Sequence, residues 1–267
     1  MLARVGMLST DKNWSRWGAE DPYYGVVSHP QFRGKNIDQN RNLFFGSGEE
    51  FVTRVLAKAD RCFGGARKNG FALDFGCGVA RLTVPLARRF GHVDGLDVSP
   101  GMLEEARKNC KAFGLGNVQF YLSNGDFEHW PRQYDFVNSY IVLQHIPLRR
   151  GYTIIGKLLD HVAIGGIAML HVSLRRRLSP ARAAAYQVRH KFPFAGYALN
   201  LLQGRHLFAP QMQMNEYDLV RVLDIFRRNK MNEVAITFEN HRSVETAMIM
   251  GRKQAVRTCA EDRPSFD

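Results

Sequence analysis

The sequence is poor in cysteine and contains no long apolar run. Four of its 267 residues are cysteine, at positions 62, 77, 110 and 259. Their spacing matches neither the CxxC pairs of zinc sites nor the CxxxCxxC run of an iron–sulfur cluster. No apolar run approaches the ~18 residues that span a bilayer, and the first residues lack the apolar core of a signal peptide. We therefore expect free thiols, no metal, no transmembrane segment and a cytoplasmic location.

Acidic residues are missing from one segment of a basic chain. The formal net charge is +12, from 37 Lys and Arg against 25 Asp and Glu. Residues 173–215 contain seven Lys and Arg and no Asp or Glu, and aromatic side chains interleave with the charges. This composition suits an anionic or sugar-phosphate ligand, a nucleic acid or an anionic membrane surface. It would equally suit a solvated cap whose charge serves only solubility.

The most informative stretch is 71–98. It is predicted to hold a strand, a glycine turn that opens a helix, and a second strand: residues 71–73, 81–90 and 92–98. Glycines allow the backbone to approach a ligand at a helix N-terminus, where free N–H groups and the helix dipole lie. Asp97 follows Gly76 by 21 residues, where a strand-end carboxylate can accept hydrogen bonds from ribose hydroxyls. The pattern predicts a nucleoside-containing cofactor.

The turn itself restricts the choice of cofactor. In the G-x-G-x-x-G fingerprint of NAD sites, the third glycine would fall at Arg81, whose long side chain does not allow close helix–strand packing. Asp74 lies inside an apolar strand, where an acid is costly unless it is paired. An ammonium group on the cofactor would pair with it, whereas a pyrophosphate would not. S-adenosylmethionine (SAM) carries an amino group, a sulfonium, a ribose and an adenine.

Four segments carry a family resemblance. Asp74-Phe-Gly-Cys-Gly78 resembles the D-x-G-x-G motif I of class I SAM-dependent methyltransferases, and residues 97–102 resemble their ribose-binding motif. Residues 124–127, after a strand over 118–122, resemble the segment that meets the adenine. Residues 134–145 resemble the fourth strand and the turn beyond it. The resemblance covers roughly 45–175, with Ala80 where a third glycine is common.

The resemblance implies an α/β fold, a doubly wound, seven-stranded, mostly parallel sheet, with an N-terminal helical cap and a basic lid insertion. The expected organisation is a cap over 1–46, a methyltransferase domain over 47–255 with the lid at 173–215, and a flexible tail over 256–267. SAM is the implied cofactor. The residues expected to bind it are Asp74, Gly76, Cys77, Gly78, Arg81, Asp97, Val98, Met102, Gly125, Asp126, Phe127 and Ser139.

The remaining pattern predicts strands that alternate with helices and then a terminal hairpin, which favours one antiparallel strand. Ser47-Gly-Glu-Glu50 is predicted to be a capping box that starts a helix, and Ser99-Pro100 is predicted to start another. Gly165-Gly166 is expected to end a helix over 148–163. The other expected elements are a strand over 167–172, a helix near 216–228 and hairpin strands over 233–238 and 246–250.

Methyl transfer from a sulfonium needs little beyond alignment of donor and acceptor. His145 is a candidate general base after the fourth strand, with Tyr140 beside it; His171 and His241 are weaker candidates. Candidates for substrate binding are Arg175, Arg189 and Tyr217.

The fourth strand ends Asn-Ser-Tyr-Ile at 138–141 rather than in the N-P-P-Y pattern of the family's nitrogen methylases. We therefore expect an oxygen acceptor in a small molecule, sugar or glycan. Three alternatives stay open at this point: an RNA methyltransferase, an NAD-linked oxidoreductase, and a non-catalytic SAM-binding or membrane-surface protein.

Overall fold

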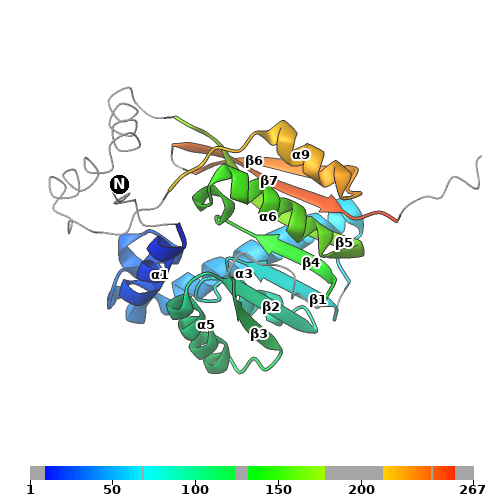
Figure 1. The fold of residues 1–267 in the computed structure, drawn as a ribbon. Helices are drawn as coiled ribbons and strands as arrows, with labels where there is room; N and C mark the ends of the chain where they lie inside the picture. The colour runs from blue at the N-terminus through cyan, green and yellow to red at the C-terminus, as the bar shows by residue number, and fades with distance from the viewer. Residues whose placement is uncertain (1–9, 68, 124–131, 178–212, 242, 256–267) are drawn as a thin grey trace, which may run out of the picture.

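The computed structural model describes residues 10–67, 69–123, 132–177, 213–241 and 243–255. A seven-stranded sheet with the strand order β3-β2-β1-β4-β5-β7-β6 forms the centre of the molecule (Figure 1). The strands are β1 (Phe71–Phe75), β2 (His92–Asp97), β3 (Val118–Leu122), β4 (Tyr134–Ser139), β5 (Val162–Arg176), β6 (Glu233–His241) and β7 (Val244–Arg252). The helices are α1 (Thr10–Glu20), α2 (Pro22–Val26), η1 (Pro30–Phe32), α3 (Asn36–Phe63), α4 (Thr83–Ala87), α5 (Pro100–Ala112), η2 (Leu143–His145), α6 (Leu148–Asp160) and α9 (Leu219–Arg228).

The sheet is mostly parallel, as expected. Strands β3, β2, β1, β4 and β5 run parallel to one another. Strand β7 pairs antiparallel with both β5 and β6. The connection reverses direction between β1 and β4, which is the switch point where open α/β sheets bind ligands. The predicted terminal hairpin and the doubly wound arrangement are confirmed.

Alternating strand residues send side chains into two hydrophobic layers, because successive side chains point to opposite faces of a sheet. Ala72 of β1 packs in the layer under α3 and α4, whereas Leu73 packs in the layer under α6 and α9. Helices therefore cover both faces, and Figure 1 shows α6 and α9 on the side of the sheet opposite α3. Burial on both faces explains why the central strands are apolar rather than alternating in sequence.

The N-terminal cap is helical, as predicted, but its last helix is much longer than expected. Helix α3 has 28 residues and runs without a break through the proposed boundary at 46/47. The capping-box prediction at Ser47 is therefore wrong: this hydroxyl donates to the Phe44 carbonyl inside the helix, at 2.7 Å. Phe44 and Phe45 are also buried, so the apolar face of α3 extends toward the N-terminus beyond Ser47. Packing of this face, rather than a cap, determines where the helix begins.

The boundaries of three other elements also differ from the sequence prediction. Helix α4 covers 83–87 instead of 81–90, and Ala80 just before it has a left-handed backbone with φ of 71°. Helix α6 ends at Asp160, and Gly165-Gly166 lies inside β5 rather than stopping a helix. Strand β5 also continues beyond 172 to Arg176, since β7 pairs with it along that length. The first residues of the predicted lid are thus part of the sheet, and its residues 178–212 lie outside the described part of the chain.

Candidate functional site

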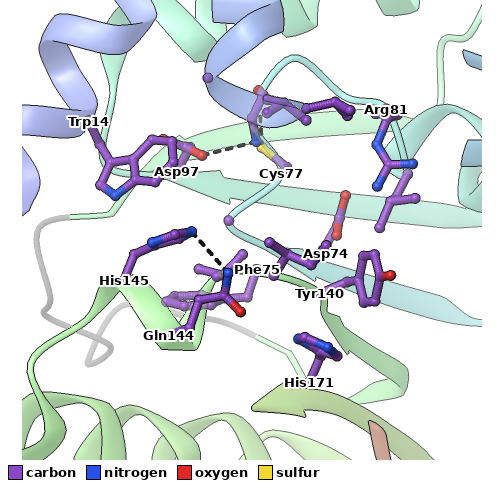
Figure 2. A pocket seen from close by; sticks show the side chains of 18 of the residues that line it. Trp14, Asp74, Phe75, Cys77, Arg81, Asp97, Tyr140, Gln144, His145 and His171 are labelled. Carbon is purple, nitrogen blue, oxygen red and sulfur yellow. Dashed lines mark hydrogen bonds between the residues drawn. The ribbon is translucent and has the colours of Figure 1, made fainter. Parts of the chain in front are cut away.

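A cavity of about 740 Å³ opens at the carboxyl ends of the parallel strands, where β1 and β4 separate. Its wall takes residues from the turn after β1, the end of β2, the segment after β4, helices α1 and α3, and the β6–β7 hairpin. Figure 2 shows 18 of the lining side chains around this space, ten of them labelled. Cavities of this size and position hold small ligands and cofactors.

The glycine turn after β1 forms one wall of the cavity. Gly76 and Gly78 have φ of 74° and 52°, a left-handed conformation that glycine adopts without strain. A Cβ at Gly76 would lie 2.3 Å from the Val142 side chain, and one at Gly78 would lie 2.5 Å from Val26. The turn is held to β2 by the N–H groups of Gly76 and Cys77, which both donate to the Leu96 carbonyl. Glycine is therefore needed at both positions, because a side chain there would overlap a valine.

Asp97 at the end of β2 is fixed by backbone donors. Its two carboxylate oxygens accept from the N–H of Gly78 and of Ser99, each at 2.9 Å. Burial raises the pKa of Asp97 to about 6, although these N–H groups act in the opposite direction. Each oxygen keeps a lone pair for a ligand hydroxyl. The Ser99 hydroxyl in turn accepts from the Met102 N–H and caps α5, as the sequence predicts.

Asp74 is almost fully buried and holds three elements together. Its carboxylate accepts from the Thr83 hydroxyl of α4 and the Asn138 amide of β4, each at 2.7 Å. Burial raises the pKa of Asp74, and these two hydrogen bonds and the charge of Arg81 partly oppose that rise. Thr83 and Asn138 were not singled out from the sequence, since they acquire this role only when β1, α4 and β4 come together.

Arg81 carries a buried guanidinium that lies beside Asp74 in the cavity (Figure 2). It is 9% exposed, and its Nη1 donates to the Ser47 hydroxyl at 3.3 Å. Within the described part of the chain its Nε has no hydrogen-bond partner, and no carboxylate lies within ion-pair distance of the guanidinium. Burial lowers the pKa of Arg81, while nearby Tyr140 and Asp74 act to raise it. A ligand carboxylate is the group that such a side chain lacks.

His145 lies in the turn after β4 and faces the cavity. Its Nδ1 donates to the Gln213 carbonyl at 2.6 Å, which leaves Nε2 as the basic nitrogen, 3.3 Å from the Gln144 amide (Figure 2). Burial lowers the pKa of His145 to about 4, so the ring is neutral at pH 7. The Trp14 ring from α1 lies 5.0 Å away, between centroids. Trp14 therefore lines the cavity.

A second aromatic group lies under α3. Tyr140 packs on Phe51, and its ring lies 4.9 Å from that of His171 and 6.3 Å from that of His241. Burial raises the pKa of Tyr140, and it lowers the pKa of His171 to about 3 with help from His241. Both histidines line the cavity.

The structure brings most of the predicted site residues to one cavity. Ten of them line it: Asp74, Gly76, Cys77, Gly78, Arg81, Asp97, Val98, Met102, Tyr140 and His145. Ser139 is buried in β4 and does not line the cavity, and Arg175 is exposed on β5. The buried Tyr217 hydroxyl donates to the Leu143 carbonyl at 2.8 Å, a structural role away from the cavity wall. Gly125, Asp126, Phe127 and Arg189 lie outside the described residues.

Comparisons with known proteins agree with this geometry. Residues 72–166 match the family described as a methyltransferase domain. The aklanonic acid methyltransferase of a Streptomyces species is 34% identical over 115 residues, which are 40% of this chain and 50% of that protein. The 23S rRNA (uracil(1939)-C(5))-methyltransferase of Xylella fastidiosa is 42% identical over 79 residues, 30% of this chain and 17% of that protein. This chain thus spans half or less of the length of these curated relatives.

A solved structure matches over almost the whole chain. The magnesium protoporphyrin IX methyltransferase of Synechocystis PCC 6803, crystallised with bound S-adenosylhomocysteine, superimposes with a TM-score of 0.62 at 17% identity. The match covers 92% of this chain and all of that one, and it shows a common fold. No helix in the described part of the chain is both long and apolar enough to cross a membrane. Residues 72–166 are thus a methyltransferase domain, and the chain has the fold of the class I SAM-dependent methyltransferases.

Proposed function

We propose that the protein transfers the methyl group of SAM to a hydroxyl oxygen of a small molecule, sugar or glycan. The observation that carries this proposal is one cavity lined by the glycine turn, Asp97 and His145. We assign the glycine turn and Asp97, which have the features of a nucleoside site, to the donor end, and His145, a neutral imidazole that can take a proton from an acceptor, to the acceptor end.

The residues at the donor end fit SAM. Asp97 is positioned to accept from the ribose hydroxyls, and the glycine turn lines the same cavity. Asp74 faces the same space with a carboxylate that can bind an ammonium group. Arg81 offers a carboxylate its guanidinium, whose Nε has no hydrogen-bond partner among the described residues. When bound, SAM supplies an activated methyl group on a sulfonium. The pyrophosphate of NAD would lie against the Asp74 carboxylate, and the two negative charges would repel each other. This argues against an NAD-linked oxidoreductase.

At the acceptor end, the protein's contribution is alignment and removal of one proton. His145 is held by the Gln213 carbonyl so that Nε2 is the free base, and its lowered pKa keeps that nitrogen unprotonated. A base in this position typically accelerates reaction of a hydroxyl by about 10²–10⁴-fold. Trp14 and other residues of the N-terminal cap form one side of the cavity, next to His145.

The choice of an oxygen acceptor rests on the site rather than on the relatives. One relative is named for a small molecule, aklanonic acid, and another for an rRNA base, so the relatives leave both classes open. The segment after β4 offers a histidine in place of the N-P-P-Y pattern, and a histidine is useful where a hydroxyl must be deprotonated.

The test is transfer of a labelled methyl group from SAM by the full chain. Panels of hydroxylated small molecules, sugars and glycans would be compared with rRNA transcripts. We expect label on an oxygen acceptor, and we expect His145→Gln to lower kcat by about 10²–10⁴-fold with little change in the Kd for SAM. Label found on RNA alone would contradict the proposed acceptor class.

A further inference from the structure

Three metal-binding side chains meet where β5 and the β6–β7 hairpin lie side by side. His171 comes from β5, and Glu239 and His241 come from β6. One ligand atom from each lies within 4.8 Å of the other two. We propose that these three residues bind a first-row divalent transition metal, such as Zn²⁺, at the edge of the cofactor cavity.

The sheet register explains how residues so far apart in sequence converge. Thr246 of β7 pairs with Ser173 of β5 on one side and with Glu239 of β6 on the other. His171 is two residues from Ser173 and points to the same face of the sheet, and Glu239 and His241 share a face for the same reason. No local sequence motif reveals this set, since the first ligand is about 70 residues from the others.

His171 is the strongest indication that the cluster has a ligand. It is 1% exposed, and neither ring nitrogen has a hydrogen-bond partner within the described ranges. A buried polar group without a partner costs about 1–3 kcal/mol, so native proteins rarely keep one. A metal ion would take one of the two nitrogens. The ring packs edge-on to Tyr140 and to His241, which restricts its orientation.

The other two ligands are already close to a binding arrangement. His241 Nε2 lies 3.2 Å from Glu239 Oε2, near the separation of roughly 3.3 Å that two ligands at 2.0–2.1 Å from a tetrahedral ion require. The other carboxylate oxygen of Glu239 lies 3.7 Å from Arg54, which holds that carboxylate in place. His241 ends its strand and is partly exposed, so that it can move toward His171.

The ligand set also indicates the metal and its role. Two imidazoles and one carboxylate suit zinc and related ions rather than Mg²⁺, which prefers oxygen ligands and water. Three protein ligands leave a coordination position open, as in catalytic rather than structural zinc sites. His171 and His241 both line the cavity, so an open position would face it. This site goes beyond the proposed function, because a metal could bind here whether or not the acceptor is a hydroxyl.

The experiment is calorimetric titration of the untagged full chain with Zn²⁺ after chelator treatment and dialysis. We expect one Zn²⁺ per chain, unaffected by millimolar Mg²⁺. Loss of a residue that only supports a ligand costs about 10–100-fold in affinity, so loss of a ligand should cost about 100-fold or more. This applies to His171→Ala, His241→Ala and Glu239→Gln.

The matched control is His92→Ala. His92 Nε2 also lies 2.8 Å from a carboxylate, that of Asp94, but at the opposite edge of the strands, so its loss should leave Zn²⁺ affinity unchanged. Absence of stoichiometric binding, or binding that survives all three substitutions, would overturn the proposal.

A measurement on the wild-type protein avoids any variant that fails to fold. X-ray absorption at the zinc edge should show a first shell of nitrogen and oxygen with two imidazoles. A shell with sulfur would place the ion at a cysteine and would also overturn the proposal.

Discussion

Replacement of Arg81 by methionine should separate binding from stability, because the two should change in opposite directions. The guanidinium is 9% exposed, and in the described part of the chain it makes one long hydrogen bond, to Ser47 at 3.3 Å. Removing a charge from water costs several kcal/mol unless hydrogen bonds and an opposite charge replace the lost solvation. Methionine keeps the apolar stem and removes the charge. We therefore expect the ligand-free variant to unfold with an equal or higher free energy than the wild type.

Cofactor affinity should instead fall. A hydrogen bond between charged groups is worth about 1.5–3 kcal/mol, so loss of the pairing between Arg81 and the SAM carboxylate should cost about 3 kcal/mol. That corresponds to a Kd roughly 100-fold higher. Urea unfolding followed by circular dichroism measures the stability, and calorimetry measures the affinity.

The matched control for this experiment is Arg88→Met. Arg88 lies seven residues on, with its side chain 46% exposed in an ion pair with Glu49. We expect this substitution to change stability by no more than about 1 kcal/mol and to leave SAM affinity unchanged. The reasoning would be refuted if Arg81→Met destabilised the ligand-free protein by more than about 2 kcal/mol and left the Kd for SAM as it was, since Arg81 would then be a structural residue.

Three further predictions concern buried titratable groups. The pKa of His145 in the folded state is about 4, below its usual 6.5, so the unfolded chain binds a proton at this residue more readily as pH falls from 6.5 to 4.5. Over that range the wild type should lose roughly 2–3 kcal/mol of unfolding free energy relative to His145→Gln. Urea unfolding at each pH measures the difference. A pH-independent difference between the two would contradict the burial of a neutral ring. Because the pKa of Asp97 is raised to about 6, SAM affinity should fall by up to about tenfold per pH unit below 6 in calorimetric titrations, and a flat profile would show that its carboxylate does not bind the ribose. Tyr134→Phe removes the hydroxyl that donates to buried Asp94 at 2.8 Å and should lower the free energy of unfolding by about 1.5–3 kcal/mol; a change below 0.5 kcal/mol would mean that this hydrogen bond contributes nothing net.

The parts of the site that sequence could predict are those that a short segment builds by itself. The turn from Asp74 to Gly78 and the carboxylate of Asp97 follow from the local pattern of strand, glycine turn and strand, and all of these residues except Phe75 were singled out beforehand. The parallel sheet and its antiparallel end also follow from the order of strands and helices. In these cases the hydrophobic periodicity, the turn residues and the tertiary contacts all favour the same structure.

The remaining features depend on contacts between distant segments. Thr83 and Asn138 hold Asp74 only once three elements are assembled, and Trp14 reaches His145 from the other end of the chain. The start of α3 was missed because Ser47 has the sequence of a cap, whereas the buried stripe continues ahead of it. Serine is common at helix caps, and it is also found inside helices, where its hydroxyl donates to a carbonyl of the preceding turn. Only the packing of the surrounding side chains distinguishes these two positions.

Binding of SAM in the cavity at the end of β1 and β2 is tested most directly by calorimetric titration of the full chain. SAM, S-adenosylhomocysteine and NAD would be titrated into the wild type and into Asp97→Ala. We expect binding of both adenosyl compounds, loss of that binding in the variant, and no binding of NAD. Binding of NAD alone, or adenosyl binding that does not depend on Asp97, would contradict it.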